Sequence, residues 1–414
     1  MKITVKEIEE AAKTLTSIVI KSPLQYSDRL SRQYDANIYL KREDLQPVRS
    51  FKLRGAYNKI MHLNDSERKN GIVTASAGNH AQGVAYACAQ LRIHGVIFMP
   101  TITPNQKIQK VKYFGGSYVT IKLIGTTFDE ANVAAQEFCT KEHACFVHPF
   151  NDPLVISGQG TVAKEIFDEL GEKLDSIIVT IGGGGLIAGV ATYLKDKNKN
   201  INIYGVEPEG ADSMRASLDA GHIVSLDTID TFVDGAAVRV VGDLTLKIAK
   251  AEVKKVLTVP VGAVCTSMIE LYQNEGIIAE PAGALSVSAL EQLKAQLKGK
   301  TVVVIITGGN NDIMRYPEIL EKSLVYRGLK HYFIIEFAQK PGALKNFLNH
   351  VLTPSDDIVL FEYMKKTNKE KGPALVGIEL KNSKHLSGLL ERMKTYEITY
   401  RKITTDDLVY NYLV

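Results

Sequence analysis

One lysine, Lys52, lies where a loop containing Pro47 passes into a helical pattern, in the stretch RSFKLRGAYNKI. In most proteins a lysine at the start of a helix is a solvated charge. If burial removes the side chain from water, its pKa falls and the amine becomes a nucleophile. The neighbouring Phe51 offers an apolar wall for such an amine. What Lys52 can do therefore depends on where the fold places it.

Four consecutive glycines, Gly182 to Gly185, separate an apolar run from a helical pattern in SIIVTIGGGGLIAGVATYL. Successive glycines let backbone N–H groups turn toward one point, and the following helix adds the positive end of its dipole. A phosphate is the expected occupant. A simple turn would need fewer glycines, because each one costs chain entropy.

The same stretch also fits a second function. Gly183, Gly185 and Ala188 match the spacing of a dinucleotide-binding fingerprint, and Glu207 follows about twenty residues later. An oxidoreductase that binds a nicotinamide dinucleotide therefore stays open as an alternative. Against it, the loop lies in mid-chain, and the segment before it supplies a lysine rather than an acid or base suited to hydride transfer.

A small-residue loop in VTASAGNHAQG precedes another helical pattern, with Ser76, Ala77, Gly78, Asn79 and His80 in sequence. Small residues bring backbone N–H groups close to a ligand, and a helix N-terminus favours an anion such as a carboxylate. Asn79 offers a neutral hydrogen bond to a ring hydroxyl. His80 is either a catalytic base or a histidine that serves the loop's own hydrogen bonds.

A third glycine-containing strand end, TVVVIITGGNNDIM, carries Thr307. A hydroxyl at this position can bond to a ring nitrogen without transferring a full proton charge. The stretches VDGAAV, around Gly235 and Ala236, and AEPAGALSV, around Glu280, are expected to form walls of the same cleft. By themselves these last two stretches have low specificity.

The elements that must position these residues follow an α/β pattern. From residue 3 to about residue 320, short apolar runs alternate with amphipathic helical patterns, which indicates parallel sheets. Ligands bind at the carboxyl ends of such strands. The runs are NIYLKRE, GIVTASA, GVIFMP, SYVTIKL, ACFVHPF, SIIVTIGGGG, INIYGVEP and TVVVIITGG.

After the linker stretch IMRYPEILEKSLVYRGLK the pattern changes, which divides the chain into domains 1–325 and 326–414. The second domain reads as the β-α-β-β-α-β order of a ferredoxin-like unit. It contains no compact cluster of nucleophile, base and orienting residue, so ligand sensing or assembly is its expected role.

The composition favours a globular protein of more than one domain. The chain has 414 residues, of which 45% are hydrophobic and 23% charged, and its small net charge of +4 is interspersed with acids. We therefore expect no nucleic-acid partner. The first residues lack a secretory signal, and no run approaches the roughly 18 apolar residues of a membrane span. A cytoplasmic location follows, with no membrane partner.

Four cysteines are few for this length and suit a reducing compartment. Cys139, His143, Cys145 and His148 lie close together in sequence and resemble a zinc-ligand set. The first two, however, lie near the end of a helical pattern, whereas ACFVHPF reads as a buried strand whose alternate side chains face opposite ways. No metal site is expected there.

The motifs SFKLRGA, SAGNHAQG, GGGGL, EPAGA and TGGN, in this order, resemble the fold-type II pyridoxal-phosphate enzymes, and among them the threonine dehydratases. The resemblance spans nearly all of residues 1–320. It implies a two-lobed catalytic unit like the β-subunit of tryptophan synthase, with a small lobe at roughly 55–155. The tail resembles the single ACT-like regulatory domain of short biosynthetic threonine dehydratases.

The resemblance also implies residue roles. Lys52 is the catalytic residue and carries pyridoxal 5'-phosphate (PLP), Phe51 packs on the ring, and Asn79 meets the ring hydroxyl. The backbone N–H groups of Gly182, Gly183, Gly184, Gly185 and Leu186 hold the phosphate. Thr307 stands at the ring nitrogen, where many biosynthetic members have serine. Substrate binding falls to Ser76, Ala77, Gly78, Asn79 and His80.

The implied reaction is dehydration and deamination of L-threonine to 2-oxobutanoate and ammonia, the first step of isoleucine biosynthesis. A serine dehydratase or racemase of the same fold is an alternative, since one methyl group is worth only about 1–3 kcal/mol to a pocket. A non-catalytic amino-acid sensor is an alternative of another class. The resemblance further implies an isoleucine or valine effector at the C-terminal domain and a homotetramer.

Overall fold

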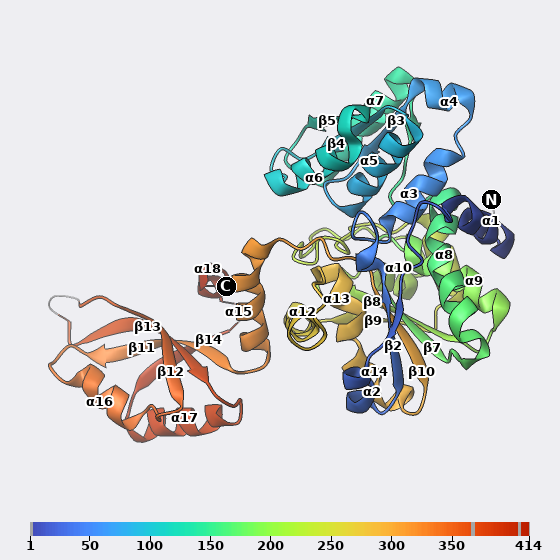
Figure 1. The fold of residues 1–414 in the computed structure, drawn as a ribbon. Coiled ribbons are helices and arrows are strands. Elements are labelled where there is room, and N and C mark those ends of the chain that lie inside the picture. The colour runs from blue at the N-terminus through green and yellow to red at the C-terminus, as the bar shows by residue number, and fades with distance from the viewer. Residues whose placement is uncertain (1–2, 366–368, 405–406, 414) are drawn as a thin grey trace. The chain divides into compact units, whose positions relative to one another are not determined.

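The computed structural model describes residues 3–365, 369–404 and 407–413, which form two compact units, Met1–Asn311 and Asp312–Val414. Figure 1 shows both units. The division falls ahead of residue 325, where the sequence pattern changes. The reason is that α15 (Tyr316–Tyr326) packs on the second unit, where the hydroxyl of Tyr332 donates to Glu321 at 2.7 Å.

A six-stranded sheet forms the centre of the first unit, in the order β1-β2-β10-β7-β8-β9. β1 is antiparallel to β2, and the other neighbouring strands are parallel. The sequence therefore predicted the α/β class with parallel strands correctly. The strands are β1 (Leu24–Tyr26), β2 (Asn37–Arg42), β7 (Ser176–Thr180), β8 (Asn202–Pro208), β9 (Lys255–Val259) and β10 (Thr301–Ile306).

Helices cover both faces of this sheet. α1 (Val5–Leu15), α8 (Pro153–Leu170), α9 (Gly185–Lys197) and α11 (Asp243–Glu252) share a core with one face, which includes Val179 of β7 and Ile305 of β10. On the other face α13 (Pro281–Ser288) contacts β7, β8 and β10. The remaining helices of the large lobe are α2 (Asp28–Tyr34), α3 (Lys52–Met61), α10 (Ser213–Ala220), α12 (Val261–Glu275) and α14 (Leu290–Leu297).

A second, four-stranded parallel sheet forms a small lobe at one end of this unit, in the order β5-β4-β3-β6 (Figure 1). Its strands are β3 (Ile72–Ala75), β4 (Gly95–Met99), β5 (Val119–Leu123) and β6 (Cys145–Phe146), and its helices are α4 (Asp65–Asn70), α5 (Asn79–Leu91), α6 (Asn105–Gly115) and α7 (Phe128–Glu142).

The strand expected for ACFVHPF is shorter than the sequence suggested. β6 pairs with β3 at Cys145 and Phe146, the Val147 N–H makes one more hydrogen bond to the Val73 oxygen at 2.8 Å, and residues 147–152 continue as a loop. Pro149 cannot donate a ladder hydrogen bond, which explains why pairing ends before it. This loop crosses to the large lobe and forms part of the site described below.

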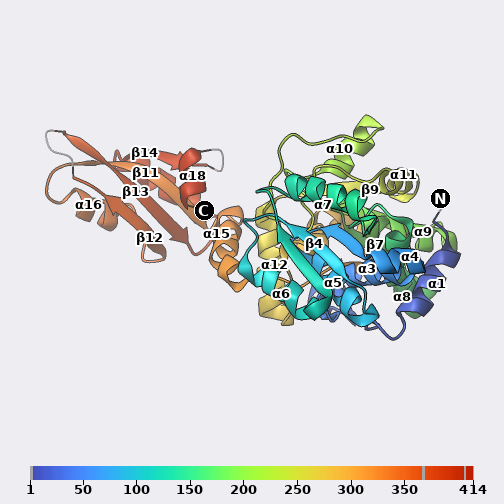
Figure 2. The same ribbon diagram turned by 90° about the horizontal axis from the view of Figure 1, so that it is seen from above.

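The second unit has the β-α-β-β-α-β order that the sequence predicted, and Figure 2 shows its sheet seen from above. Its sheet has the order β12-β13-β11-β14 and is antiparallel throughout. The elements are β11 (Lys330–Ala338), α16 (Ala343–His350), β12 (Asp356–Tyr363), β13 (Lys371–Leu380), α17 (His385–Thr395), β14 (Thr399–Ile403) and α18 (Leu408–Leu413).

In both units, no helix among the described residues has the length and apolar composition needed to cross a membrane.

Candidate active site

The strand ends singled out in the sequence come together in the first unit. β7 and β10 are parallel neighbours, so the glycine loop after β7 and Thr307 after β10 leave the sheet at the same edge. The segment before α3 joins them there, because the N–H of Phe51 donates to the carbonyl oxygen of Thr307 at 3.1 Å. Ser50 also forms an antiparallel bridge with Gly308. The first turn of α3 is therefore fixed to the end of β10.

Lys52 is the first residue of α3, and its amine lies among protein groups. Nζ donates to the carbonyl oxygen of Pro149 at 3.0 Å and lies 5.5 Å from the centroid of the Phe51 ring. Burial lowers the pKa of Lys52 to about 8, although the carboxylate of Glu280 opposes this shift. Lys52 is half-buried, and its lowered pKa leaves more of the amine neutral, and hence nucleophilic, near neutral pH than in an exposed lysine.

The glycine loop packs so closely that side chains would not fit. A Cβ on Gly183 would lie 2.2 Å from the ring of Phe150, and one on Gly185 would lie 3.0 Å from the Phe150 carbonyl oxygen. Gly184 has a φ of +90°, a backbone conformation that favours glycine. α9 starts at Gly185, and no side chain of the described residues caps it. Its first N–H groups therefore remain available to an anion.

The loop before α5 is held by its own serine. The hydroxyl of Ser76 accepts from the N–H groups of Gly78 at 3.2 Å and Ala81 at 3.3 Å. Within the described residues α5 has no side-chain cap at its N-cap residue Gly78. The start of α5 thus resembles the start of α9, with backbone N–H groups suited to a carboxylate.

His80 serves the structure of the site rather than its acid–base chemistry. Its Nε2 lies 3.0 Å from the carbonyl oxygen of Val147, in the loop after β6. Burial, with a smaller effect of Lys52, lowers the pKa of His80 to about 3. The ring is therefore neutral at ordinary pH and links two loops of the small lobe.

Asn79 contacts two residues of the large lobe. Its Nδ2 donates to Oε1 of Glu280 at 2.6 Å, and its Oδ1 accepts from Nδ2 of Asn310 at 2.7 Å. Glu280 is 5% exposed, and burial raises its pKa to about 7, with Asp234 adding to the effect. Asn79 therefore reaches the cleft from the small lobe and is oriented from the large one.

Thr307 is 2% exposed, and its hydroxyl donates to the carbonyl oxygen of Ala282 at 3.0 Å. The hydroxyl of Thr180, at the end of β7, donates to the same oxygen at 3.0 Å. The Ala282 oxygen keeps the Thr180 donor, so the Thr307 hydroxyl can rotate and donate its hydrogen to another acceptor at this edge of the sheet.

Sequence reasoning missed the loop of residues 147–152. Pro149 accepts from Lys52, and Phe150 packs against the glycine loop. His148 Nδ1 accepts from the N–H groups of Phe150 at 3.2 Å and Asn151 at 2.8 Å, and burial lowers the pKa of this histidine to about 4. A proline in an apolar run was the available signal that the strand ends there.

The stretch around Gly235 and Ala236 lies against the glycine loop and against Glu280 of the other low-specificity stretch. A Cβ on Gly182 would lie 3.2 Å from Cα of Ala236, and one on Gly235 would lie 3.8 Å from Oε1 of Glu280. Asn310 was not singled out in the sequence. It follows the two glycines after Thr307, which was the only local hint of its position.

Glu207 does not have the environment that the dinucleotide alternative requires. It is 0% exposed, and its oxygens accept from the N–H groups of Met214 at 2.8 Å and Arg215 at 2.9 Å. Burial raises its pKa to about 8. The carboxyl group is occupied at the start of α10 and is not presented to a ribose.

No group of three or more metal-ligating side chains is found among the residues that the structure describes. In the cysteine and histidine cluster, the thiol of Cys139 donates to the carbonyl oxygen of Ala144 at 2.9 Å, and Nδ1 of His148 is occupied by backbone N–H groups.

These features fit PLP. The tightly packed glycine loop before an uncapped helix suits a phosphate, the desolvated amine of Lys52 suits a carbonyl group, and Thr307 offers a neutral hydroxyl to a ring nitrogen.

Comparisons with known families agree with this arrangement. Residues 15–308 match the family model described as pyridoxal-phosphate dependent enzyme. Residues 321–413 match the model of the C-terminal regulatory domain of threonine dehydratase.

Curated relatives resemble the chain over its whole length. It is 51% identical over 412 residues to the biosynthetic L-threonine dehydratase of Bacillus subtilis (strain 168), which covers 100% of this chain and 98% of that protein. It is 52% identical over 415 residues to the biosynthetic L-threonine dehydratase of Lactococcus lactis subsp. lactis, with 100% of both chains covered.

Solved structures show the same fold. The processed form of threonine deaminase isoform 2 from Solanum lycopersicum superposes with a TM-score of 0.74 at 39% identity, covering 77% of this chain and 88% of that one. Maize serine racemase superposes with a TM-score of 0.73 at 32% identity, covering 79% and 99%.

Proposed function

The chain belongs to the pyridoxal-phosphate-dependent threonine dehydratases, and we propose that Lys52 is the residue to which it binds its cofactor. It is a lyase that converts L-threonine to 2-oxobutanoate and ammonia, the first step of isoleucine biosynthesis. One observation carries the assignment of Lys52. This amine, with a pKa of about 8, lies at the edge of the sheet where the glycine loop and Thr307 meet.

The other cofactor contacts follow from the positions of the side chains and loops. Phe51 adjoins Lys52 and packs on the ring, Asn79 meets the ring hydroxyl, and Thr307 meets the ring nitrogen. The phosphate is held by the backbone N–H groups at the start of α9. These belong to Gly182, Gly183, Gly184, Gly185 and Leu186.

The substrate carboxylate binds at the start of α5. Ser76, Ala77, Gly78, Asn79 and His80 form this subsite, to which Ala77, Asn79 and His80 offer their backbone N–H groups. The N–H groups of Ser76 and Gly78 shape the loop instead, because they donate to the carbonyl oxygen of Phe98 and to the Ser76 hydroxyl. The neutral His80 ring holds the loop in place and moves no proton.

When bound, PLP draws electron density from the substrate's Cα and so makes its proton removable. Once the substrate amine has displaced it from the cofactor, the Lys52 amine would take this proton, because its lowered pKa of about 8 makes it a suitable base. Thr307 offers a hydroxyl where a carboxylate would keep the ring nitrogen protonated, which favours loss of the β-hydroxyl over transamination. The Pro149 carbonyl oxygen orients the Lys52 amine, and the next residue, Phe150, packs against the glycine loop.

The test is the variant Lys52→Ala. We expect the purified variant to lose both the visible absorbance of bound PLP and formation of 2-oxobutanoate from L-threonine. Lys6→Ala is the matched control, because the Lys6 side chain is 84% exposed and lies on α1. Retention of both signals in Lys52→Ala would refute the assignment.

L-Serine is a second substrate candidate, which the similarity to maize serine racemase supports. We propose threonine as the preferred substrate and serine as a slower one. The ratio of kcat/KM for the two amino acids decides this, and a ratio in favour of serine would overturn the preference.

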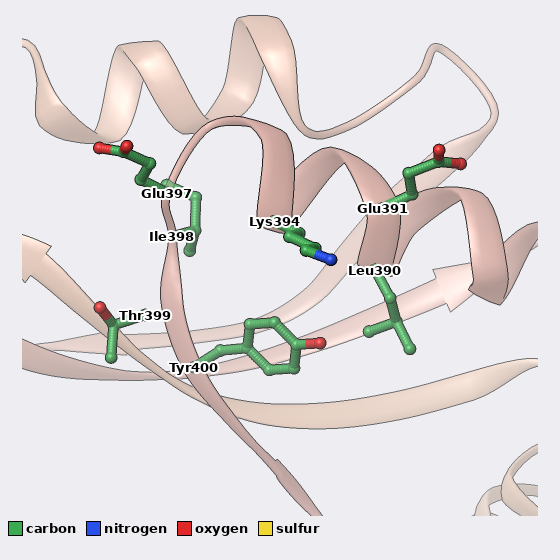
Figure 3. A pocket seen from close by; sticks show the side chains of 7 residues that line it. All are labelled: Leu390, Glu391, Lys394, Glu397, Ile398, Thr399 and Tyr400. Atoms are coloured by element: carbon green, nitrogen blue, oxygen red, sulfur yellow. The ribbon is translucent and has the colours of Figure 1, made fainter.

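We further propose that isoleucine or valine regulates the enzyme through the second unit. A pocket of about 590 Å³ lies there between the end of α17 and the start of β14. In Figure 3 the Lys394 ammonium and the Tyr400 ring lie at its middle beside Leu390. Lys394 suits the carboxylate of an aliphatic amino acid, Leu390 and Ile398 suit its side chain, and Glu391 and Glu397, which also line the pocket, suit its ammonium group.

Lys394→Ala should abolish inhibition by isoleucine or valine and leave the uninhibited rate unchanged. Lys381→Ala is the matched control, since Lys381 is an exposed lysine of the same unit. Unchanged inhibition in Lys394→Ala would place the effector elsewhere. We also propose that the enzyme is a cytoplasmic homotetramer, which light scattering of the purified protein and cell fractionation test.

A further inference from the structure

The amide of Asn79 is held at both of its polar ends. Nδ2 donates to Glu280 Oε1 at 2.6 Å, and Oδ1 accepts from Asn310 Nδ2 at 2.7 Å. A half-turn of the amide would put two donors against each other at Asn310 and two acceptors against each other at Glu280. The orientation of the amide is therefore imposed, and the second N–H of Nδ2 is the donor that it can still offer.

Glu280 is built into this position. It is the N-cap residue of α13, and its Oε2 accepts from the backbone N–H of Asn310 at 3.2 Å. A Cβ on Gly308 would lie 2.2 Å from Glu280 Oε1, so the loop after β10 can approach the carboxylate only because this residue is glycine. One carboxylate thus fixes both Asn79 and the Asn310 backbone.

Asn310 completes a set of hydrogen bonds that joins Asn79, Glu280 and Asn310, and we call this set the clamp. Its Nδ2 donates to the carbonyl oxygen of Val48 at 2.8 Å as well as to Asn79, and its Oδ1 accepts from Lys110 Nζ at 3.0 Å. Asn79 and Lys110 come from the small lobe, whereas Glu280 and Asn310 come from the large lobe. The orientation of the Asn79 amide consequently depends on the contact between the two lobes.

Glu280 also affects the charge of the Lys52 amine. The Glu280 carboxylate is the charged group that raises the pKa of Lys52 against the larger effect of burial. Two charged groups act on the pKa of Glu280, which Asp234 raises and Lys107 lowers. Asp234 and Lys107 form an ion pair with each other.

We propose that Glu280 is a positioning residue for the reaction, which fixes the N–H end of the Asn79 amide for the ring hydroxyl of PLP and sets the charge beside Lys52. This inference rests on the proposed function, because it takes from it the contact of Asn79 with the ring hydroxyl. Glu280 itself acts through Asn79 and Lys52 and is not a catalytic residue.

The first test measures the dissociation constant of PLP from the cofactor-free protein by equilibrium dialysis. Glu280→Gln places an amide N–H against the backbone N–H of Asn310 or against Asn79, so we expect PLP affinity to fall about tenfold, the size of one hydrogen bond to a charged group. Asn79→Ala should weaken binding to a similar degree. The double variant should bind less weakly than the sum of the two single effects predicts, because Glu280 acts in part through Asn79.

The second test separates the clamp from the charge. Asn310→Ala removes the donor to Asn79 Oδ1 and keeps the carboxylate, so it should weaken PLP binding and leave the pH midpoint of Lys52 labelling in the cofactor-free protein unchanged. Glu280→Gln should lower that midpoint, because it removes the negative charge. Glu275→Gln is the matched control, since Glu275 also accepts two hydrogen bonds, from Ser27 and Arg29.

The inference is overturned if Glu280→Gln binds PLP as the parent protein does, or if its effect adds fully to that of Asn79→Ala. If Glu280→Gln does not fold, as judged by thermal unfolding, Asn310→Ala tests the clamp by itself. If Asn79→Ala leaves PLP affinity unchanged, the contact of Asn79 with the ring hydroxyl is wrong and this inference falls with it. The assignment of Lys52 is tested separately.

Discussion

The guanidinium of Arg54 donates to both carboxylate oxygens of Glu43, at 2.8 Å each, and both side chains are 0% exposed. Arg54 also contacts Glu165 of α8 at 2.7 Å, and Glu165 contacts Lys41 of β2 at 2.6 Å. Two acids and two bases thus form a buried network that is neutral as a whole. Arg54 lies within one turn of Lys52 on α3. The network therefore joins that helix to β2 and α8.

Arg54→Met should reduce the free energy of unfolding by about 3–5 kcal/mol, because it leaves Glu43 buried without its cation. Urea unfolding followed by circular dichroism measures this. Arg32→Ala is the control, since Arg32 and Asp28 form an exposed pair, which is worth about 0.2–1 kcal/mol at most. Equal effects of the two substitutions would show that the buried network contributes little.

The buried pair of Arg54 and Glu43 also makes the stability of the fold sensitive to acid. Burial alone would raise the pKa of Glu43, but Arg54 outweighs it, so the folded pKa lies below the unfolded value. The stabilisation is therefore present above the unfolded pKa, about 4.3 for glutamate, and is lost as pH falls through the folded pKa. Stability measured from pH 7 to pH 3 should decline, and part of this decline should be absent in Glu43→Gln. An identical pH dependence in both proteins would contradict this account.

Lys52 should react with amine reagents at lower pH than other lysines. Its pKa of about 8 means that the neutral, reactive amine appears as pH rises through 8, whereas an ordinary lysine needs a pH of about 10.4. Labelling of the cofactor-free protein between pH 6 and pH 11, read by peptide mass spectrometry, gives both midpoints. A midpoint for Lys52 equal to that of exposed Lys6 would show that the amine is not desolvated.

Gly183→Ala should weaken PLP binding by more than tenfold, because the added Cβ would lie 2.2 Å from the Phe150 ring and would displace the glycine loop. The double variant Gly183→Ala with Phe150→Ala should recover part of the loss, since it removes the clash. Equilibrium dialysis of PLP measures both. Full affinity in Gly183→Ala would mean that the loop tolerates a side chain and does not hold the phosphate.

Thr307→Ser should retain kcat within about twofold, because the hydroxyl that donates to Ala282 is kept. Thr307→Val removes the hydroxyl at nearly constant volume and should lower kcat about tenfold or more, the effect of losing one hydrogen bond at the cofactor. The rate of 2-oxobutanoate formation at saturating threonine distinguishes them. Equal rates for Thr307→Ser and Thr307→Val would show that the Thr307 hydroxyl does not contribute to the reaction.

Candidate residues for the chemistry were easier to recognise in the sequence than the residues that hold those candidates in position. The glycine loop stands out because a run of four glycines is uncommon, whereas Lys52 stands out through the resemblance of the motif SFKLRGA to PLP enzymes. The βαββαβ order of the second unit was also readable, because its apolar alternation is regular. These patterns are formed by residues that are close together in the sequence, so they can be recognised without a structure.

Glu280, Asn310 and the loop of residues 147–152 were less visible, because their roles arise from contacts with distant residues. Glu280 meets Asn79 across 201 positions of sequence, and Pro149 meets Lys52 across 97. His80 was ambiguous for the same reason. The contact with Val147, in the loop after β6, and the lowered pKa show that its ring is engaged and neutral.

The place of β10 in the large sheet governs when the site can exist during synthesis. β10 lies between β2 and β7 and is hydrogen-bonded to both, although it is the last of the six strands to be made. Until residue 306 has left the ribosome, β2 and β7 have no strand between them, and the Phe51 N–H lacks the Thr307 oxygen that fixes the start of α3. A nascent chain that stops short of β10 carries Lys52 and the glycine loop in full, yet lacks the strand that lies between β2 and β7 and the Thr307 oxygen. The site is therefore complete only when almost the whole catalytic unit has been made.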